Sequence, residues 1–188
     1  MKKKKRGILL SVLCMLSILL TACSVNGGKT VVTCDGYEVQ LGKTTVAELK
    51  EAGFTNRYSH SDPKRIYGAS WENFYAMKDD VSYGTMFAGN KGSSMIEFDE
   101  GVIFEMSFSY NDPEYPVGEI LVKGTNFEGY TKEKVKEVMD NAKITLDSDT
   151  YLIFEADGCK YTFSFADGSE TVTDIRVNDG TEIEYVVN

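Results

Sequence analysis

The spacing of apolar residues divides the chain into three kinds of segment. Residues 7–20 form an apolar run that directly follows five consecutive basic residues. Residues 98–109 and 154–165 carry apolar and aromatic side chains at alternating positions, as expected for strands with one buried face. Residues 131–142 instead repeat apolar side chains at the i, i+3, i+4, i+7 spacing of a helix packed on a core. The pattern predicts a short leader followed by strands and helices.

Local signals fix the ends of several of these elements. Residues 30–41 predict a hairpin, because two apolar strands flank Asp35-Gly36, a pair that tolerates positive φ at both central positions of a turn. Residues 45–48 form a capping box, Thr-Val-Ala-Glu, and Gly53 is placed to end the helix that begins there. A second helix is predicted from Thr131.

Two halves of the chain share this order of elements. TVAELKEA at residues 45–52 resembles TKEKVKEV at 131–138, and FDEGVIFEMSFS at 98–109 resembles FEADGCKYTFSF at 154–165. In both hairpins a glycine, Gly101 or Gly158, is predicted to take positive φ. The helices are 86 residues apart and the hairpins 57, so the first half holds 29 extra residues.

The repeat leads to a specific fold prediction. We expect an α+β fold of two tandem units, each one helix packed on an antiparallel β-meander. The first unit spans residues 30–124 with an insertion within 54–93, and the second spans 125–188. Matched positions should both face the core, namely Leu49 with Val135 and Phe108 with Phe165.

The first 22 residues have the layout of a bacterial lipoprotein signal peptide. A basic head and a short apolar run lead to Leu-Thr-Ala-Cys, which ends at Cys23. The 16 residues from 7 to 22 fall short of the roughly 20 that a membrane-spanning helix needs. We therefore expect a diacylglyceryl anchor on Cys23, a polar tether at 23–29, and a lipid-anchored domain on the extracytoplasmic face of the cell membrane. The type of envelope stays open.

The composition of the mature chain restricts its partners. Cleavage before Cys23 would leave fifteen Lys and Arg against all 29 Asp and Glu, a formal charge of −14. A domain of this charge is repelled by nucleic acid, which we exclude as a partner. Two cysteines remain besides Cys23, and an exported chain could join Cys34 and Cys159 in a disulfide or keep both as buried thiols.

The sequence contains no motif for a known chemistry. It has no phosphate-binding loop, HExxH, CxxC, GxSxG or EF-hand loop. The only histidine, His60, lies in a polar segment before Pro63, and acidic pairs such as Asp79-Asp80 are typical of turns. We therefore predict no catalytic residue, no metal site and no cofactor.

The predicted insertion contains the best candidates for recognition. Its positive charge and aromatic side chains contrast with the acidic domain, and these residue types concentrate binding energy at interfaces. The alternative is an additional strand packed in the core, which we favour for Phe74. The candidate recognition surface comprises Arg57, Lys64, Arg65, Tyr67 and Trp71.

The run GYEVQLGKTTVAELKEAGF at residues 36–54 resembles a group of Gram-positive surface lipoproteins of largely unknown function. Residues 127–177 resemble the later part of the same pattern, a helix followed by a hairpin around Asp-Gly. More distantly, tandem helix-plus-meander units resemble β-lactamase inhibitory protein, and one such unit resembles the small lipoprotein of the outer-membrane β-barrel assembly machinery. Both of these are binding proteins.

Three functions are compatible with these observations. The leading one is a non-enzymatic binding or scaffold domain for an envelope protein or a cell-wall polymer. The second is an inhibitor or regulator of a cell-wall enzyme, and the third is a hydrolase.

Overall fold

The computed structural model describes residues 29–58, 62–112, 114–166 and 168–180. Half of the described residues lie in strands, and 11% are helical. The elements are β1 (Lys29–Cys34), β2 (Tyr37–Leu41), α1 (Val46–Glu51), β3 (Thr55–Arg57), β4 (Arg65–Ile66), β5 (Ser70–Lys78), β6 (Val81–Asn90), β7 (Ile96–Glu97), the 3-10 helix η1 (Phe98–Glu100), β8 (Val102–Ser109), β9 (Ile120–Val122), α2 (Lys132–Val138), β10 (Lys143–Asp147), β11 (Tyr151–Ala156), β12 (Cys159–Ser164) and β13 (Asp174–Asn178).

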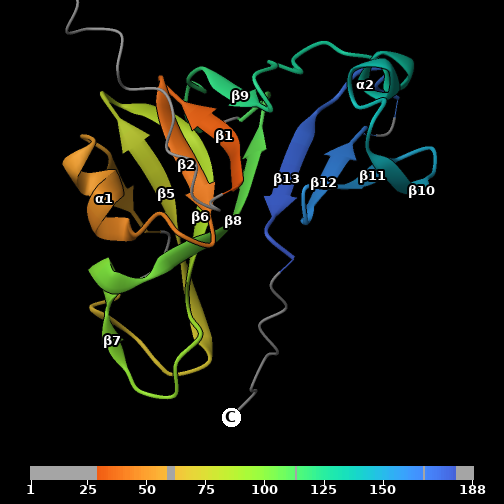
Figure 1. The fold of residues 1–188 in the computed structure, drawn as a ribbon. Coiled ribbons are helices and arrows are strands. Elements are labelled where there is room, and N and C mark those ends of the chain that lie inside the picture. The colour runs from red at the N-terminus through yellow and green to blue at the C-terminus, as the bar shows by residue number, and fades with distance from the viewer. Residues whose placement is uncertain (1–28, 59–61, 113, 167, 181–188) are drawn as a thin grey trace, which may run out of the picture.

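One antiparallel sheet of eight strands dominates the molecule (Figure 1). Its strand order is β10-β11-β12-β13-β8-β6-β5-β3, while β2-β1-β9 and β4-β7 form two smaller sheets. The strands that follow α1 and those that follow α2 meet where β13 pairs with β8 over five residue pairs. The prediction of an α+β fold with two tandem helix-plus-meander units is therefore wrong. The fold is mostly β, and backbone pairing between β8 and β13 joins the strands of both halves in one continuous sheet in place of two units.

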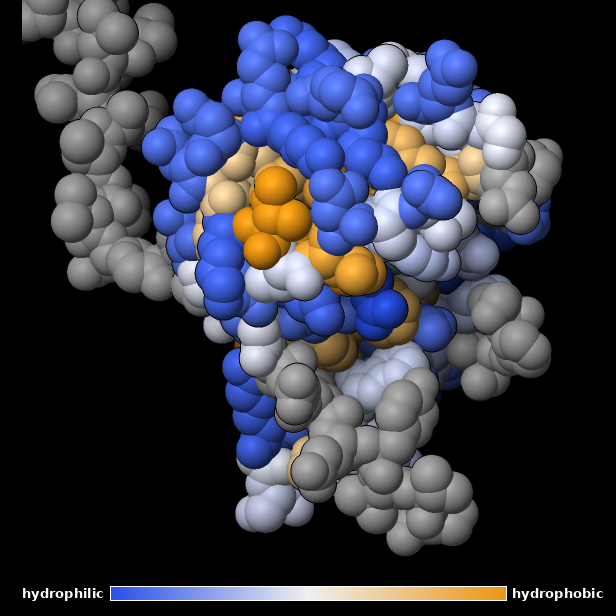
Figure 2. Space-filling view, turned by 90° about the vertical axis from the view of Figure 1, so that its right-hand side faces the viewer, coloured by the Kyte–Doolittle hydropathy of each residue, from blue (hydrophilic) through white to orange (hydrophobic). Residues whose placement is uncertain are grey.

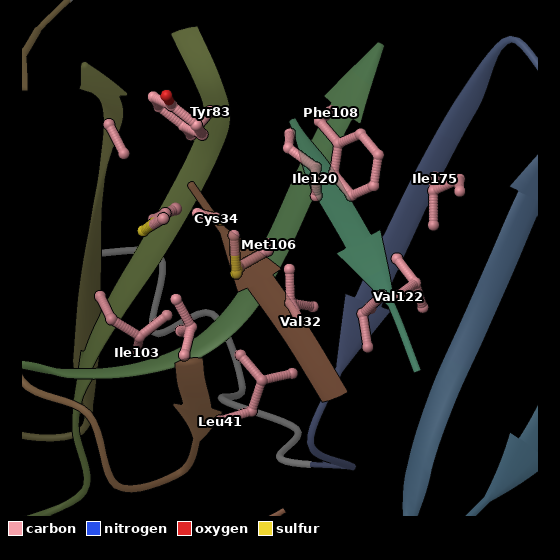
Figure 3. Packing of buried hydrophobic residues seen from close by; sticks show 14 of the residues in the cluster. Val32, Cys34, Leu41, Tyr83, Ile103, Met106, Phe108, Ile120, Val122 and Ile175 are labelled. Carbon is pink, nitrogen blue, oxygen red and sulfur yellow. The ribbon is translucent and has the colours of Figure 1, made fainter. Parts of the chain in front are cut away.

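One face of this sheet carries the core. Successive side chains of a strand point to opposite faces, so residues paired across strands share a face. Figure 3 shows Val32 and Ile120 of the three-stranded sheet gathered with Met106 and Phe108 of β8 in one apolar cluster. A row of buried side chains crosses six strands on this face: Phe154, Tyr161, Val177, Met106, Met86 and Phe74.

The hairpin of β1 and β2 forms where the sequence predicts it. Asp35 and Gly36 both have positive φ, 47° and 75°, as a two-residue turn of this hand requires. Cys34 and Leu41 of the hairpin are buried in the core cluster, and β9 pairs with the other side of β1.

Both predicted helices begin at the predicted residues. Thr45 and Glu48 form the capping box, with the Glu48 carboxylate accepting from the Thr45 amide at 2.8 Å. The Thr131 hydroxyl accepts from the Lys134 backbone amide at 3.3 Å. The capping box is incomplete here, because a lysine side chain has no acceptor for the Thr131 backbone N–H. The predicted burial of Leu49, Val135, Phe108 and Phe165 is confirmed.

The segment expected to be an insertion lies inside the sheet. Residues 54–93 contribute β3, β4, β5 and β6, and β6 pairs with β5 on one side and β8 on the other. Phe74 is buried, as predicted for a packed strand. This segment therefore carries part of the central core.

The hairpin predicted around Gly101 is also different. Gly101 has φ −61°, and η1 replaces the predicted first strand. The reason is local, because the Glu100 carboxylate accepts from the Glu97 amide at 3.0 Å and caps the short helix. Gly158 does take the predicted positive φ, 68°.

The predicted signal peptide and Cys23 lie outside the described residues. Among the residues that are described, no helix is both long and apolar enough to span a membrane.

Candidate functional site

The second face of the large sheet carries polar and aromatic side chains. Cross-strand pairing places one residue from each of the eight strands in a continuous row, and each is exposed or half-buried. The row is Leu146, Ile153, Thr162, Arg176, Ser107, Thr85, Tyr75 and Arg57. We call this surface the open face. An antiparallel sheet with one buried and one solvated face shows this alternation.

At the β3 end of the open face, three side chains stack on one another. The Arg57 guanidinium lies 4.7 Å from the centre of the Tyr115 ring, within the range of a cation–π contact. Tyr115 in turn lies 6.1 Å from Tyr75, measured between ring centres. The Tyr115 hydroxyl donates to the Glu114 carboxylate, which raises the pKa of Tyr115. Arg57 is thereby held over an aromatic surface.

A second aromatic group lies on the same face, closer to its centre. Trp71 and Tyr75 are four residues apart on β5 and so point to the same side. The Trp71 and Phe87 rings are 5.3 Å apart, and Phe87 lies 6.3 Å from Phe104. The Arg176 guanidinium lies 6.0 Å from the Phe87 ring and joins this group to the middle of the row.

A buried carboxylate fixes the position of Arg176. The Glu105 side chain is only 4% exposed, and its Oε1 lies 2.6 Å from the guanidinium of Arg176. The Asn178 amide donates to the other carboxylate oxygen at 2.9 Å. Arg176 itself remains 58% exposed. The ion pair crosses from β8 to β13, so it also joins the two halves of the sheet.

The residues predicted to form a recognition surface are divided between two places. Arg57 and Trp71 lie on the open face. Lys64, Arg65 and Tyr67 lie on or beside β4, which pairs with β7 in a separate two-stranded sheet. The predicted recognition surface left out Tyr75, although it belongs to the aromatic residues of the predicted insertion, and sequence reasoning missed Phe87, Tyr115, Glu105 and Arg176. The alternation of Asp174, Arg176 and Asn178 along β13 indicates a solvated face, but it does not reveal which strands lie beside it.

The β10 edge of the sheet bears an apolar patch. Figure 2 looks onto this end of the molecule and shows apolar side chains surrounded by hydrophilic ones. Exposed Val138, Ile144 and Leu146 lie on α2 and β10. A bulge turns Ile144 toward the covered face, opposite Phe154, and Leu146 toward the open face. Such bulges protect an edge strand from pairing with another chain, so this edge is a poor docking site.

The structure describes both cysteines whose pairing the sequence leaves open. Cys34 and Cys159 are both buried thiols and are not joined in a disulfide. Cys34 pairs with Ile120 at one end of β9. Just after the other end of β9, Lys123 forms an ion pair with Asp157 in the turn between β11 and β12.

The described residues can be searched for a metal cluster or a reactive nucleophile. Within the described ranges, no three His, Cys, Asp or Glu side chains come together in an arrangement that could hold a metal ion. His60 lies outside those ranges. Burial raises the pKa of the Cys34 thiol to about 12, which keeps it protonated and a weak nucleophile. The open face offers hydrogen-bonding, aromatic and guanidinium groups, which are suited to binding.

No protein-family model, curated protein or solved structure matches the chain.

Proposed function

We propose that the mature chain is a non-enzymatic, lipid-anchored extracytoplasmic domain that binds an envelope protein or a cell-wall polymer on its open face. The observation that carries this proposal is the row of exposed and half-buried side chains across all eight strands, with Arg57 and Arg176 both lying over aromatic rings. Arginine, tyrosine and tryptophan dominate the binding energy of protein interfaces.

Rigidity of the open face supports a binding role. Its side chains project from paired strands, and Arg176 is held by Glu105 while still reaching solvent. Groups that are already ordered lose little conformational entropy when a partner binds. The two arginines also offer bidentate contacts to carboxylate groups, which both proteins and cell-wall polymers can carry.

The experiment compares what the native lipoprotein captures after crosslinking in its own envelope. Arg57→Ala and Tyr115→Ala each remove part of the stack at the β3 end. Lys134→Ala is the matched control, because Lys134 is an exposed lysine of α2 outside the open face. All variants are first checked for unchanged melting. We expect Arg57→Ala and Tyr115→Ala to reduce capture of the same partner at least tenfold, and the control to retain it.

A partner retained equally by all three variants would contradict binding at the β3 end of the open face. Cosedimentation with purified cell wall distinguishes a polymer from a protein, because only a polymer ligand persists after the envelope proteins are stripped.

The anchor is tested separately. Cys23→Ala removes the thiol that would carry the diacylglyceryl group, and stable anchoring generally takes two acyl chains. We expect the variant to leave the membrane fraction, and intact-mass analysis of the wild-type protein to show a chain that starts at lipid-modified Cys23. A variant that still partitions quantitatively with membranes would refute the anchor.

A further inference from the structure

Two loops meet beyond the ends of β5 and β6 and form a small projecting structure. They comprise residues 64–69 and 91–95, which we call the tip. The Asn90 side chain ties them together, because its Nδ2 donates to the carbonyl oxygens of Ile66, Tyr67 and Ser94 at 3.2, 3.1 and 2.7 Å. Its Oδ1 accepts from the Gly92 amide at 2.9 Å. The tip is therefore an organised structure with a buried polar hub.

Close backbone contact also holds the two loops. A Cβ on Gly68 would lie 2.4 Å from the Ser93 carbonyl oxygen, so no larger residue fits there. In the two-stranded sheet of β4 and β7, Ile66 pairs with Ile96, and Ile66 is fully buried. Tyr67 follows Ile66 and Met95 precedes Ile96, and the side chains of Tyr67 and Met95 are both exposed.

Tyr67 and Met95 are the apolar part of the tip surface. Tyr67 is 69% exposed and Met95 is 46% exposed. Tyrosine is enriched where a bilayer meets water, because its ring is apolar and its hydroxyl is polar. Methionine is flexible enough to fill irregular apolar surroundings. The pair has the chemistry of a small membrane-inserting contact.

The charged residues of the tip are all basic. They are Lys64, Arg65 and Lys91, and residues 64–69 and 91–95 contain no Asp or Glu. Their acidic partners lie just outside the tip. Lys91 lies 3.7 Å from the buried carboxylate of Asp179, whereas the pairs of Lys64 with Asp62 and of Arg65 with Glu97 are exposed. Exposed pairs of this kind are weak and can be exchanged for lipid phosphates. The residues of the tip themselves carry a formal charge of +3, in a mature chain of charge −14.

The first described strand after the predicted anchor, β1, begins on the side of the three-stranded sheet that is nearer the tip. The first residue of β1, Lys29, pairs with Leu41. Gly42, the residue after Leu41, donates its backbone N–H to the Ile103 carbonyl at 2.7 Å. Ile103 pairs with Ala88 of β6, two residues before Asn90, where the tip begins. Figure 1 shows β7 at the opposite end of the molecule from β9 and α2.

The tether is short enough to bring this end to the bilayer. Six residue steps separate Cys23 from Lys29, a reach of about 20 Å when extended. We propose that the tip is a second, non-covalent membrane contact, with Tyr67 and Met95 at the headgroup level of a phospholipid bilayer and Lys64, Arg65 and Lys91 on lipid phosphates. This inference rests on the proposed anchor at Cys23. With the tip on the bilayer, the strands of the large sheet point away from the membrane and the open face stays exposed to solvent.

The test uses the full lipoprotein reconstituted into vesicles, with a polarity-sensitive fluorophore on a single new thiol. Met95→Cys reports on the tip, and Ser94→Cys is a second tip position in case the first disturbs folding. Thr145→Cys on β10 is the control, because it is exposed and far from the tip. Cys34 and Cys159 are buried, so they should not take up the label in the folded protein.

We expect the tip labels to shift to the blue and to be quenched by brominated lipid, more strongly in phosphatidylglycerol than in phosphatidylcholine vesicles. The control label should keep its aqueous spectrum. Lys64→Gln with Lys91→Gln should remove the preference for phosphatidylglycerol.

Flotation of the same samples separates the two proposals. Protein that floats with the vesicles while its tip labels stay aqueous refutes the tip contact and leaves the anchor intact. Protein that fails to float refutes the anchor, and the tip contact with it.

Discussion

Ile175 offers a direct test of whether the eight strands behave as one sheet. It lies on β13, paired with Phe163 of β12 on one side and Phe108 of β8 on the other, and it is fully buried. Ile175→Ala removes apolar volume at the junction between the strands that follow α1 and those that follow α2.

The size of the effect follows from this packing. Replacing a buried Ile by Ala typically costs about 2–5 kcal/mol, and two aromatic neighbours fixed on adjacent strands limit how far the site can collapse. We take about 3 kcal/mol. With a urea dependence of about 2 kcal/mol/M for a domain of this size, the midpoint of unfolding should fall by about 1.5 M.

The assay uses the single tryptophan of the chain. Trp71 lies on β5, separated from β13 by β8 and β6, so its fluorescence reports on strands that the substitution does not touch. Far-UV circular dichroism reports on the whole chain. In one cooperative sheet, both signals should move to the same lower midpoint. Lys160→Ala, on an exposed position of β12, should shift neither by more than about 0.5 kcal/mol.

Two results would refute the reasoning. One is a Trp71 midpoint that stays at the wild-type value while circular dichroism shows an earlier transition, because that outcome means independent halves. The other is an unchanged midpoint in both signals, which would mean that Ile175 is not packed at the junction.

Three further predictions concern stability. The buried Tyr161 hydroxyl has no hydrogen-bond partner among the described atoms, so Tyr161→Phe should leave the free energy of unfolding unchanged or raise it by about 1 kcal/mol; a loss above 1 kcal/mol in urea titration would contradict this. Asn90→Ala removes the polar hub of the tip and should cost about 2–3 kcal/mol in the same titration, whereas an unchanged midpoint would show that the tip does not depend on it. Burial raises the pKa of Cys34 from 9.0 to about 12 and that of Tyr58 from 10.0 to about 12, so the folded state holds these protons more tightly than the unfolded state. This stabilisation is fully present below about pH 9 and should be lost as the pH rises toward about 12. Urea titrations at about pH 8 and about pH 10.5 measure the free energy of unfolding at each pH. An equal or greater free energy of unfolding at the higher pH would contradict the prediction.

Local signals in the sequence predict the elements that depend only on neighbouring residues. Thr45 and Glu48 are three residues apart, and Asp35 and Gly36 are adjacent, so the helix start and the first turn are specified within a few positions. The Asp79-Asp80 pair also forms a turn, between β5 and β6, with φ of 52° and 62°. Asp tolerates this conformation less readily than Gly, so the pair is a weak signal for so long a hairpin.

The arrangement of the strands is not local and could not be predicted in this way. Alternation shows that β8 and β13 each have a buried and a solvated face, but it does not show that they pair. Because strand pairing is not visible in the sequence, the 29 extra residues of the first half are predicted to be an insertion, whereas in the structure this segment contains β5 and β6. The open face was missed for the same reason, since Arg57, Tyr75 and Arg176 come to lie in one row only through the register of four strand pairings.

The claim that the open face binds a partner is tested most directly by site-specific photocrosslinking in cells that produce the protein. A photoreactive amino acid replaces Ser107 or Thr162 in the middle of the open face, and in a third variant it replaces Glu133, an exposed residue of α2. The account predicts a discrete crosslinked product from Ser107 and Thr162 that is absent from Glu133 and is reduced by Arg57→Ala. The absence of any product from both open-face positions, with the protein folded and at the membrane, would contradict it.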